Sequence, residues 1–182
     1  QGVTQYANAA AAIAAMHALR NNPRWIANGR DRFDQAIAQG LRAARVPGRL
    51  QCLQQAPEVI VDVAHNPQAA RVLAQWLDTH PVGGRTHAVF GALADKDVAG
   101  ILAALLAHID AWHLAGLDQV SPRGLSANAL ADLFSRAHPG GRCDMHDDVA
   151  GALAAARAMC TAADRVIAFG SFFVASAVLA EY

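Results

Sequence analysis

Residues 59–63 read Val-Ile-Val-Asp-Val, a short apolar run in which one acidic side chain, Asp62, follows three β-branched residues. Runs of this kind are typical of a parallel strand that is buried on both faces of a sheet. An ionised carboxylate inside such a strand is strongly destabilising unless it has a partner or a function. Asp62 is therefore the first candidate for a functional residue.

The turn after this strand carries the signals of a helix start. Asn66 is a favoured N-cap residue, and Pro67 stands where the first helical residue would lie. The sequence thus predicts a helix over residues 68–77, with the positive end of its dipole beside Asp62 and His65. Open α/β sheets bind ligands at this position, beyond the carboxyl ends of their strands.

Short strands and helices of about ten residues alternate through the rest of the chain. A strand at 49–53 comes first, and further strands are predicted at 86–91, 111–115, near 142–145 and at 166–169. The intervening helices are predicted at 97–108, 126–137 and 148–160, with a last one from 172. This alternation indicates βαβ units. We therefore expect an α/β fold, a Rossmann-like three-layer sandwich of about six mostly parallel strands with flanking helices.

The N-terminal part of the chain has a different pattern. Good helix formers run from Thr4 to Leu19, and Asn21-Asn22-Pro23 stops them. Residues 25–30 read as a linker, and a second helix is predicted over 31–45 with Asp31 as its cap. We expect residues 1–30 to be the end of a preceding domain with its linker, and residues 31–182 to form the α/β domain.

Composition limits the partners of this chain. Fifteen basic residues balance fifteen acidic ones, so no bulk charge favours nucleic acid or an anionic membrane. No apolar run approaches the roughly 18 residues that a membrane span needs. The three cysteines, Cys52, Cys143 and Cys160, are widely spaced without a CxxC pair, which argues against a disulfide framework or a zinc site. We expect a cytoplasmic protein with no metal ligands of its own.

Further polar residues stand close to predicted strand ends. Lys96, the only lysine, follows one strand, Arg123 follows the next, and Ser171 follows the last, while Arg49 comes shortly before Asp62. Each has a structural alternative: a solvated charge for the basic residues and a helix cap for Ser171. Because the carboxyl ends of parallel strands share one edge of a sheet, these residues together predict an anion-binding polar rim.

The chain lacks the common phosphate-binding strings. It contains neither GxxxxGK[ST] nor GxGxxG, and its one lysine follows Asp95. If a nucleotide binds here, the cradle for its phosphates lies outside this chain.

The motifs, in their order, resemble the C-terminal part of the dihydrofolate synthase/folylpolyglutamate synthase family, which is related to the Mur ligases. The matching strings are Pro47-Gly48-Arg49, Asp62-Val63-Ala64-His65-Asn66-Pro67, Gly91 through Asp97, Ser121-Pro122-Arg123-Gly124 and Gly170-Ser171-Phe172. Residues 5–10, Gln-Tyr-Ala-Asn-Ala-Ala, are similar to the final helix of the family's central ATPase domain. The resemblance implies that residues 1–30 belong to that domain and that 31–182 form a Mur-ligase-like C-terminal domain.

The resemblance also implies an activity. The family joins L-glutamate to dihydropteroate, to folyl-polyglutamate or to both, through an acyl phosphate made with ATP and Mg²⁺. The partners implied are ATP, L-glutamate, dihydropteroate or a folate, and the N-terminal ATPase domain of the same polypeptide, which holds the metal and the phosphate cradle. The isolated chain is then expected to be inactive. Two alternatives stay open: a Mur-type amino-acid ligase domain and a non-catalytic nucleotide-binding module.

The same resemblance assigns roles to single residues. ATP contacts are implied for Asn8, Arg49, Asp62 and His65. Glutamate contacts are implied for Ser171 and Arg123, and Lys96 is a further candidate. No catalytic residue and no metal ligand is assigned to this chain.

Overall fold

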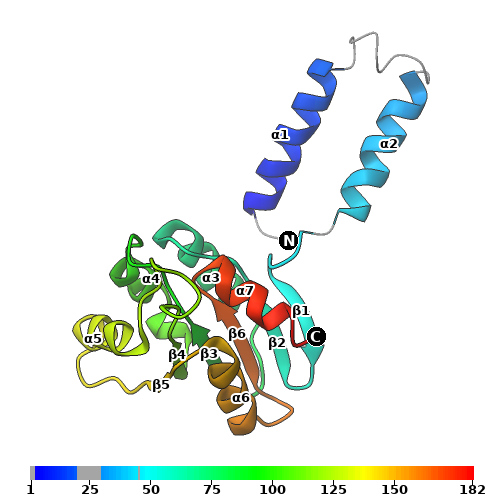
Figure 1. Cartoon of the computed structure of the whole chain (residues 1–182). Coiled ribbons are helices and arrows are strands. Elements are labelled where there is room, and N and C mark those ends of the chain that lie inside the picture. The colour runs from blue at the N-terminus through cyan, green and yellow to red at the C-terminus, as the bar shows by residue number, and fades with distance from the viewer. Residues whose placement is uncertain (1–2, 20–29, 45) are drawn as a thin grey trace. The chain divides into compact units, whose positions relative to one another are not determined.

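The computed structural model describes residues 3–19, 30–44 and 46–182, and the chain divides into two compact units, Gln1–Val46 and Pro47–Tyr182. The first unit contains the helices α1 (Val3–Leu19) and α2 (Arg30–Ala43) (Figure 1). The rings of His17 and Phe33, one from each helix, lie 5.8 Å apart in an edge-to-face arrangement. Both predicted helices are therefore present, although α2 begins one residue earlier than expected and ends at Ala43. The predicted stop at 21–23 and residues 25–29 of the predicted linker lie outside the described residues, and Arg30, predicted as the end of the linker, begins α2.

The second unit is an α/β domain. Its strands are β1 (Gln51–Gln55), β2 (Glu58–Val61), β3 (Thr86–Phe90), β4 (Ala111–Ala115), β5 (Asp144–His146) and β6 (Arg165–Phe169). Its helices are α3 (Pro67–Thr79), α4 (Val98–Leu105), α5 (Ala127–Ala137), α6 (Val149–Met159) and α7 (Phe172–Leu179), and a 3-10 turn, Leu106–His108, follows α4. No described helix is long and apolar enough to cross a membrane.

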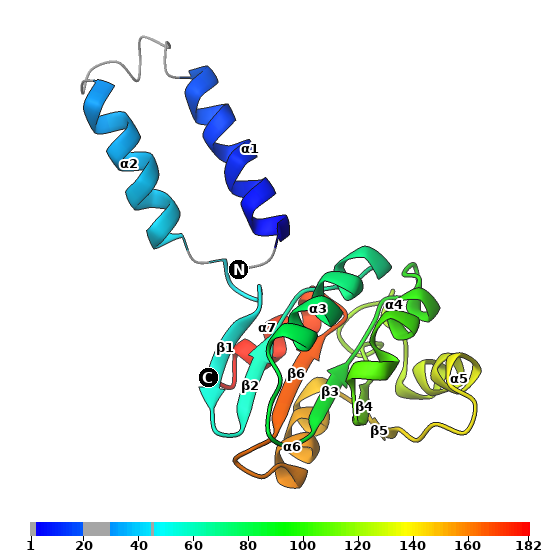
Figure 2. The ribbon, with the colours of Figure 1, turned by 180° about the vertical axis from the view of Figure 1, so that it is seen from behind.

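The strands form one six-stranded sheet in the order β1-β2-β6-β3-β4-β5 (Figure 2). Strand β1 is antiparallel to β2, and all the other neighbours are parallel. In register, Val61 of β2 stands opposite Ala168 of β6, and Phe90 of β3 stands opposite Phe169 of β6. The predicted Rossmann-like, mostly parallel sheet of about six strands is thus confirmed.

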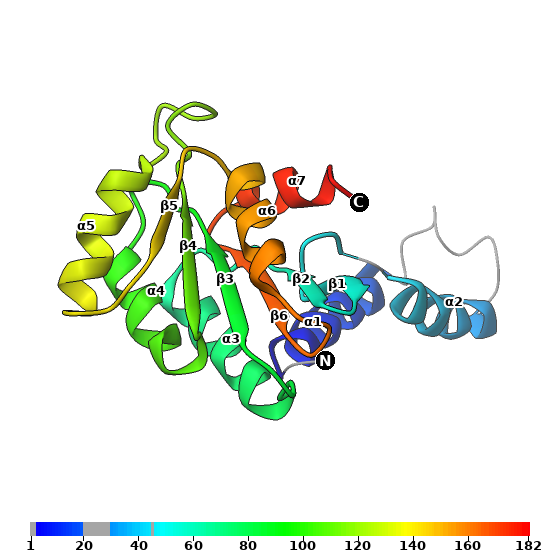
Figure 3. The same cartoon turned by 90° about the horizontal axis from the view of Figure 1, so that it is seen from below.

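Helices cover both faces of the sheet, which gives three layers (Figure 3). Helices α3, α4 and α5 pack on the face that presents Ile60, Phe90 and Phe169. Helices α6 and α7 pack on the other face, which presents Val61 and Val89. Because successive side chains of a strand point to opposite faces, the same short apolar runs supply both cores.

The insertion of β6 between β2 and β3 creates a topological switch point. The helices that follow β2 and β3, α3 and α4, cover one face, whereas α7, which follows β6, covers the other. The chain therefore leaves neighbouring strand ends in opposite directions at the carboxyl edge. In open α/β sheets this is the place where ligands bind.

Side-chain caps fix the start of each helix in this domain. Asn66 Oδ1 accepts a hydrogen bond from Ala69 N at 2.9 Å, and Pro67 is the first helical residue of α3, as the sequence predicts. The same kind of cap begins the other helices, at Asp97, Ser126, Asp148 and Ser171. The caps place each helix start directly after the loop that leaves a strand.

Two predicted strands differ from the observed ones at the place that matters for the site. The strand expected at 49–53 begins at Gln51, because Gly48 and Leu50 have positive φ values, 68° and 43°, and form a turn. The strand expected at 59–63 ends at Val61. Asp62 therefore lies just beyond the strand, where its carboxylate can reach loop backbone.

We predict that Gly170→Ala lowers the free energy of unfolding by at least about 1–3 kcal/mol, from backbone strain and from the clash of the added Cβ. Gly170 has φ +111°, and a Cβ there would lie 2.3 Å from the carbonyl oxygen of Gly91. Gly83→Ala is the matched control, because nothing lies within 4 Å of its added Cβ. Denaturant unfolding of both variants measures the difference, and equal stabilities would contradict this account of the β3–β6 edge.

Candidate functional site at the carboxyl edge of the sheet

Asp62 connects two loops at the end of β2. Its Oδ2 accepts a hydrogen bond from Leu50 N at 2.9 Å, and its Oδ1 accepts one from Ala64 N at 2.7 Å. The side chain is almost fully buried, and this burial raises the pKa of the carboxyl above its ordinary value, while the two backbone N–H groups act in the opposite direction. The carboxylate thus has the partners that its burial requires. Each oxygen still has a second lone pair that can accept from a ligand.

The turn from Pro47 to Leu50 holds Arg49 beside this carboxylate. Besides the bond from Leu50, Gly48 O accepts a hydrogen bond from Val63 N at 2.8 Å. A Cβ on Gly48 would lie 3.0 Å from Val63 Cγ1, so the turn packs closely against the residues after β2. Arg49 is exposed, and its charge contributes to the electrostatic environment of Asp62. A guanidinium in this position suits an anionic ligand.

His65 is oriented by its own loop. Its Nδ1 lies 2.7 Å from Val63 O, and since a carbonyl oxygen only accepts, Nδ1 carries the proton. Nε2 is then the nitrogen left for a ligand. The ring centroid lies 5.8 Å from that of Phe172, which is 62% exposed at the start of α7. The loops after β2 and β6 therefore present a partly exposed pair of rings.

The loop after β6 brings backbone and a hydroxyl to the same edge. Gly170 N donates to Ala64 O at 2.9 Å, which ties this loop to the one after β2. Ser171 Oγ accepts from Val174 N at 3.1 Å, so Ser171 is the N-cap of α7 and is buried. A hydroxyl that accepts at its oxygen can still donate its hydrogen to a ligand.

Lys96 and Arg123 meet through a shared carboxylate at the ends of β3 and β4. Lys96 Nζ lies 2.9 Å from Asp95 Oδ2, and Arg123 Nη1 lies 3.8 Å from the same oxygen. The hydrogen bond from Lys96 is the main cause that lowers the pKa of Asp95. Backbone pairing between Leu93 and Gly124 joins the two loops. The Arg123 side chain is 64% exposed, so it can turn to another anion.

The structure groups the candidate residues only in part. Asp62, Arg49, His65 and Ser171 gather where β2 and β6 end, whereas Lys96 and Arg123 form a separate pair at β3 and β4. Asn8 is exposed on α1 in the other unit.

Sequence reasoning missed Phe172 as a site residue. An apolar aromatic ring in the first turn of a helix, directly after Gly170-Ser171, was the available signal.

The gathered groups fit a nucleoside better than a chain of phosphates. Asp62 offers buried acceptor oxygens for hydroxyl groups, and His65 and Phe172 offer rings, whereas Arg49 is the one cation among the described residues gathered here. Among the described residues, the one group of three side chains able to hold a metal is His87, Cys160 and Asp164. It lies at the opposite edge of the sheet, so the rim itself has no such group.

The fold and the polar rim together define a class of protein. It is an α/β domain with a candidate ligand site at its topological switch point. The sequence matches the family described as Mur ligase, glutamate ligase domain, over residues 48–172. These residues include all six strands and every sequence motif from β1 onwards. The chain belongs to this family, and the predicted resemblance to the Mur ligase group is confirmed.

Individual proteins and solved structures are also similar to this chain. Dihydrofolate synthase/folylpolyglutamate synthase of Escherichia coli strain K12 is 39% identical over 172 residues, which cover 94% of this chain and 37% of that protein. A structure of E. coli FolC in complex with ADP, without folate substrate, matches with a TM-score of 0.79 and 38% identity over 96% of this chain and 38% of that chain. A bifunctional folylpolyglutamate synthase/dihydrofolate synthase with Mn, AMPPNP and L-glutamate bound matches with a TM-score of 0.73 and 41% identity, over 81% and 34%. The chain thus spans little more than a third of these relatives.

Asp62→Ala should lower the free energy of unfolding by about 1–3 kcal/mol, because it leaves the N–H groups of Leu50 and Ala64 without their acceptor. Asp132→Ala, on the exposed side of α5, is the control and should stay within about 0.5 kcal/mol of the wild type. Thermal or urea unfolding followed by circular dichroism gives both values. An Asp62→Ala variant as stable as the control would show that the carboxylate does not hold the two loops together.

Proposed function

We propose that this chain is the C-terminal domain of an ATP-dependent ligase that adds L-glutamate to dihydropteroate, to folyl-polyglutamate or to both. One observation carries the proposal. The loops that meet at the β2–β6 edge are those whose sequences resemble this family, and they present a buried acceptor, an exposed cation and two rings at one place. The relatives with 38–41% identity bear the names of such enzymes.

The roles of the rim residues follow from what each can offer. Asp62 accepts hydrogen bonds from the ribose hydroxyls of ATP, and Arg49 pairs with its phosphates. His65 contacts the nucleotide through Nε2, and Asn8 contributes from the preceding unit. The incoming glutamate would span the two groups: the Ser171 hydroxyl at the end of β6 offers it a hydrogen bond. Arg123 suits its carboxylate at the ends of β3 and β4, where Lys96 is a further cation.

The phosphate cradle and the Mg²⁺ site belong to the preceding ATPase domain in this proposal. The chain has no GxxxxGK[ST] string. We assign residues 1–30 to the end of that domain and its linker, and residues 31–182 to the glutamate ligase domain. In this assignment α2, which belongs to the first compact unit, leads into the ligase domain. The three cysteines are free thiols, which suits a cytoplasmic location.

The proposed chemistry has two steps. A carboxylate of the acceptor attacks the γ-phosphorus of ATP, giving an acyl phosphate and releasing ADP. The glutamate amine, after losing a proton, then attacks the acyl carbon, forming the amide and releasing inorganic phosphate. The domain binds the nucleoside and orients the amine, and by closing on the ATPase domain it keeps water from the acyl phosphate.

The proposed activity is tested with the full enzyme that contains this chain, using labelled glutamate, ATP and one acceptor at a time. We expect incorporation with dihydropteroate, with a reduced folate or with both, and none with residues 1–182 alone, which lack the P-loop. Incorporation into a peptidoglycan precursor instead would assign the domain to a Mur-type amino-acid ligase. Nucleotide binding without transfer to any acceptor would make it a non-catalytic module.

Arg49→Ala in the full enzyme should raise the KM for ATP by about 10- to 100-fold, the range expected for one lost charge-assisted hydrogen bond. Because Arg49 is exposed, the melting temperature should not change. Arg136→Ala removes another exposed arginine, in the last turn of α5, and should leave both values unchanged. The same KM in both variants would exclude Arg49 from the nucleotide site.

A further inference from the structure

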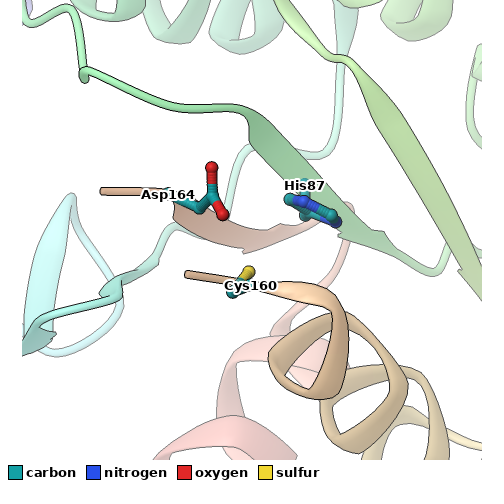
Figure 4. Close-up of side chains that lie close together, drawn as sticks. All are labelled: His87, Cys160 and Asp164. Carbon is teal, nitrogen blue, oxygen red and sulfur yellow. The ribbon is translucent and has the colours of Figure 1, made fainter. Parts of the chain in front are cut away.

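A mixed cluster of side chains lies at the amino-terminal edge of the sheet, opposite the polar rim. His87 stands near the start of β3, Cys160 directly follows α6, and Asp164 directly precedes β6. One potential ligand atom from each residue lies within 4.8 Å of the others. Figure 4 shows the three side chains converging from these separate elements on one space.

The histidine of this cluster has an unused nitrogen. His87 is only 1% exposed, and its Nδ1 lies 3.4 Å from His113 Nε2. Its Nε2 has no hydrogen-bond partner among the described residues and has almost no contact with solvent. A buried polar atom of this kind is destabilising unless something binds it.

Neighbouring groups favour a lone pair on that nitrogen. If His87 Nδ1 carries the proton and donates to His113 Nε2, 3.4 Å away, Nε2 of His87 has a lone pair for a metal. Asp144 Oδ2 lies 3.9 Å from His113 Nδ1 without a hydrogen bond, and its negative charge favours a proton on that Nδ1, which leaves His113 Nε2 as the acceptor.

Asp164 keeps one lone pair for a ligand. Its Oδ2 accepts hydrogen bonds from the backbone N and the hydroxyl of Thr161, and its Oδ1 accepts one from Arg85 N at 2.6 Å. Since each carboxylate oxygen has two lone pairs, Oδ1 can take one more partner. The same hydrogen bonds hold the carboxylate in place.

We propose that His87, Cys160 and Asp164 bind one divalent transition-metal ion of the zinc type, with water as the fourth ligand. The donor set decides the class of ion, because a thiolate and an imidazole suit zinc or cobalt, whereas magnesium and calcium prefer oxygen alone. In a tetrahedral zinc site with bonds of about 2.0–2.3 Å, two ligand atoms stand about 3.3–3.8 Å apart. The present separations, up to 4.8 Å, therefore need to close by about 1 Å, which side-chain rotation must supply.

Metal binding at this cluster releases one proton. The Cys160 thiol loses its proton to solvent as the metal–sulfur bond forms, while His87 and Asp164 bind through existing lone pairs. The ion would join the end of α6 to the starts of β3 and β6. It would thus stabilise the domain away from the polar rim, and the inference does not depend on the proposed ligase activity.

The sequence predicted no zinc site, because the three cysteines are widely spaced without a CxxC pair. The parallel sheet brings them together by placing the starts of β3 and β6 side by side. The site would therefore be visible only in the folded chain.

Cobalt(II) tests the site without reference to activity. The reduced, metal-free chain is titrated with Co²⁺ while the near-ultraviolet thiolate-to-cobalt band and the visible bands are recorded. We expect saturation at one equivalent, release of one proton, a melting temperature raised by Zn²⁺ and no response to Mg²⁺. Cys160→Ser should abolish the thiolate band and weaken Co²⁺ binding at least about tenfold.

Cys143→Ser is the matched control, because Cys143 is also a half-buried free thiol but lies outside the cluster. It should bind Co²⁺ as the wild type does. The proposal is overturned if the wild-type chain shows no thiolate band at a stoichiometric amount of Co²⁺, or if the band persists in Cys160→Ser.

Discussion

Strand β6 pairs with β2 on one side and with β3 on the other, and all three strands end at the same edge of the sheet. The helices after these strands depart to opposite faces, so the loops after β2 and β6 meet at the strand ends. Gly170, with its positive φ, allows the β6 loop to approach the carbonyl oxygen of Gly91. The polar rim exists because of this single crossover, and residues distant in sequence become neighbours through it.

Asp62 shows how one group can serve both the fold and the site. Burial disfavours its charge, and the N–H groups of Leu50 and Ala64 compensate for part of that effect. The same hydrogen bonds fix the turn that carries Arg49 and the loop that carries His65. A ligand that binds Asp62 would therefore find its neighbours already placed, which lowers the entropy lost on binding. Structural and functional explanations of this residue do not compete.

Local sequence signals predicted most of the helices and strands. The features that the sequence did not predict depend on contacts between residues distant in the chain. Asn66-Pro67, Asp148 and Ser171 marked helix starts correctly, because a cap depends on residues three positions away. The end of β2 before Asp62 could not be predicted, because it depends on a turn with unusual φ values at Gly48 and Leu50. The pairing of His65 with Phe172 and the convergence of His87 with Cys160 are tertiary contacts. Such contacts leave no periodic pattern in a sequence.

Nucleotide binding where β2 and β6 end is the central element of the proposed function. The most direct measurement is a crystal structure of the full enzyme that contains this chain, with a non-hydrolysable ATP analogue and L-glutamate. We predict that Asp62 contacts the ribose, that Arg49 reaches a phosphate, and that glutamate lies near Ser171 and Arg123. A nucleotide that touches no residue of the loops after β2 and β6 would contradict it.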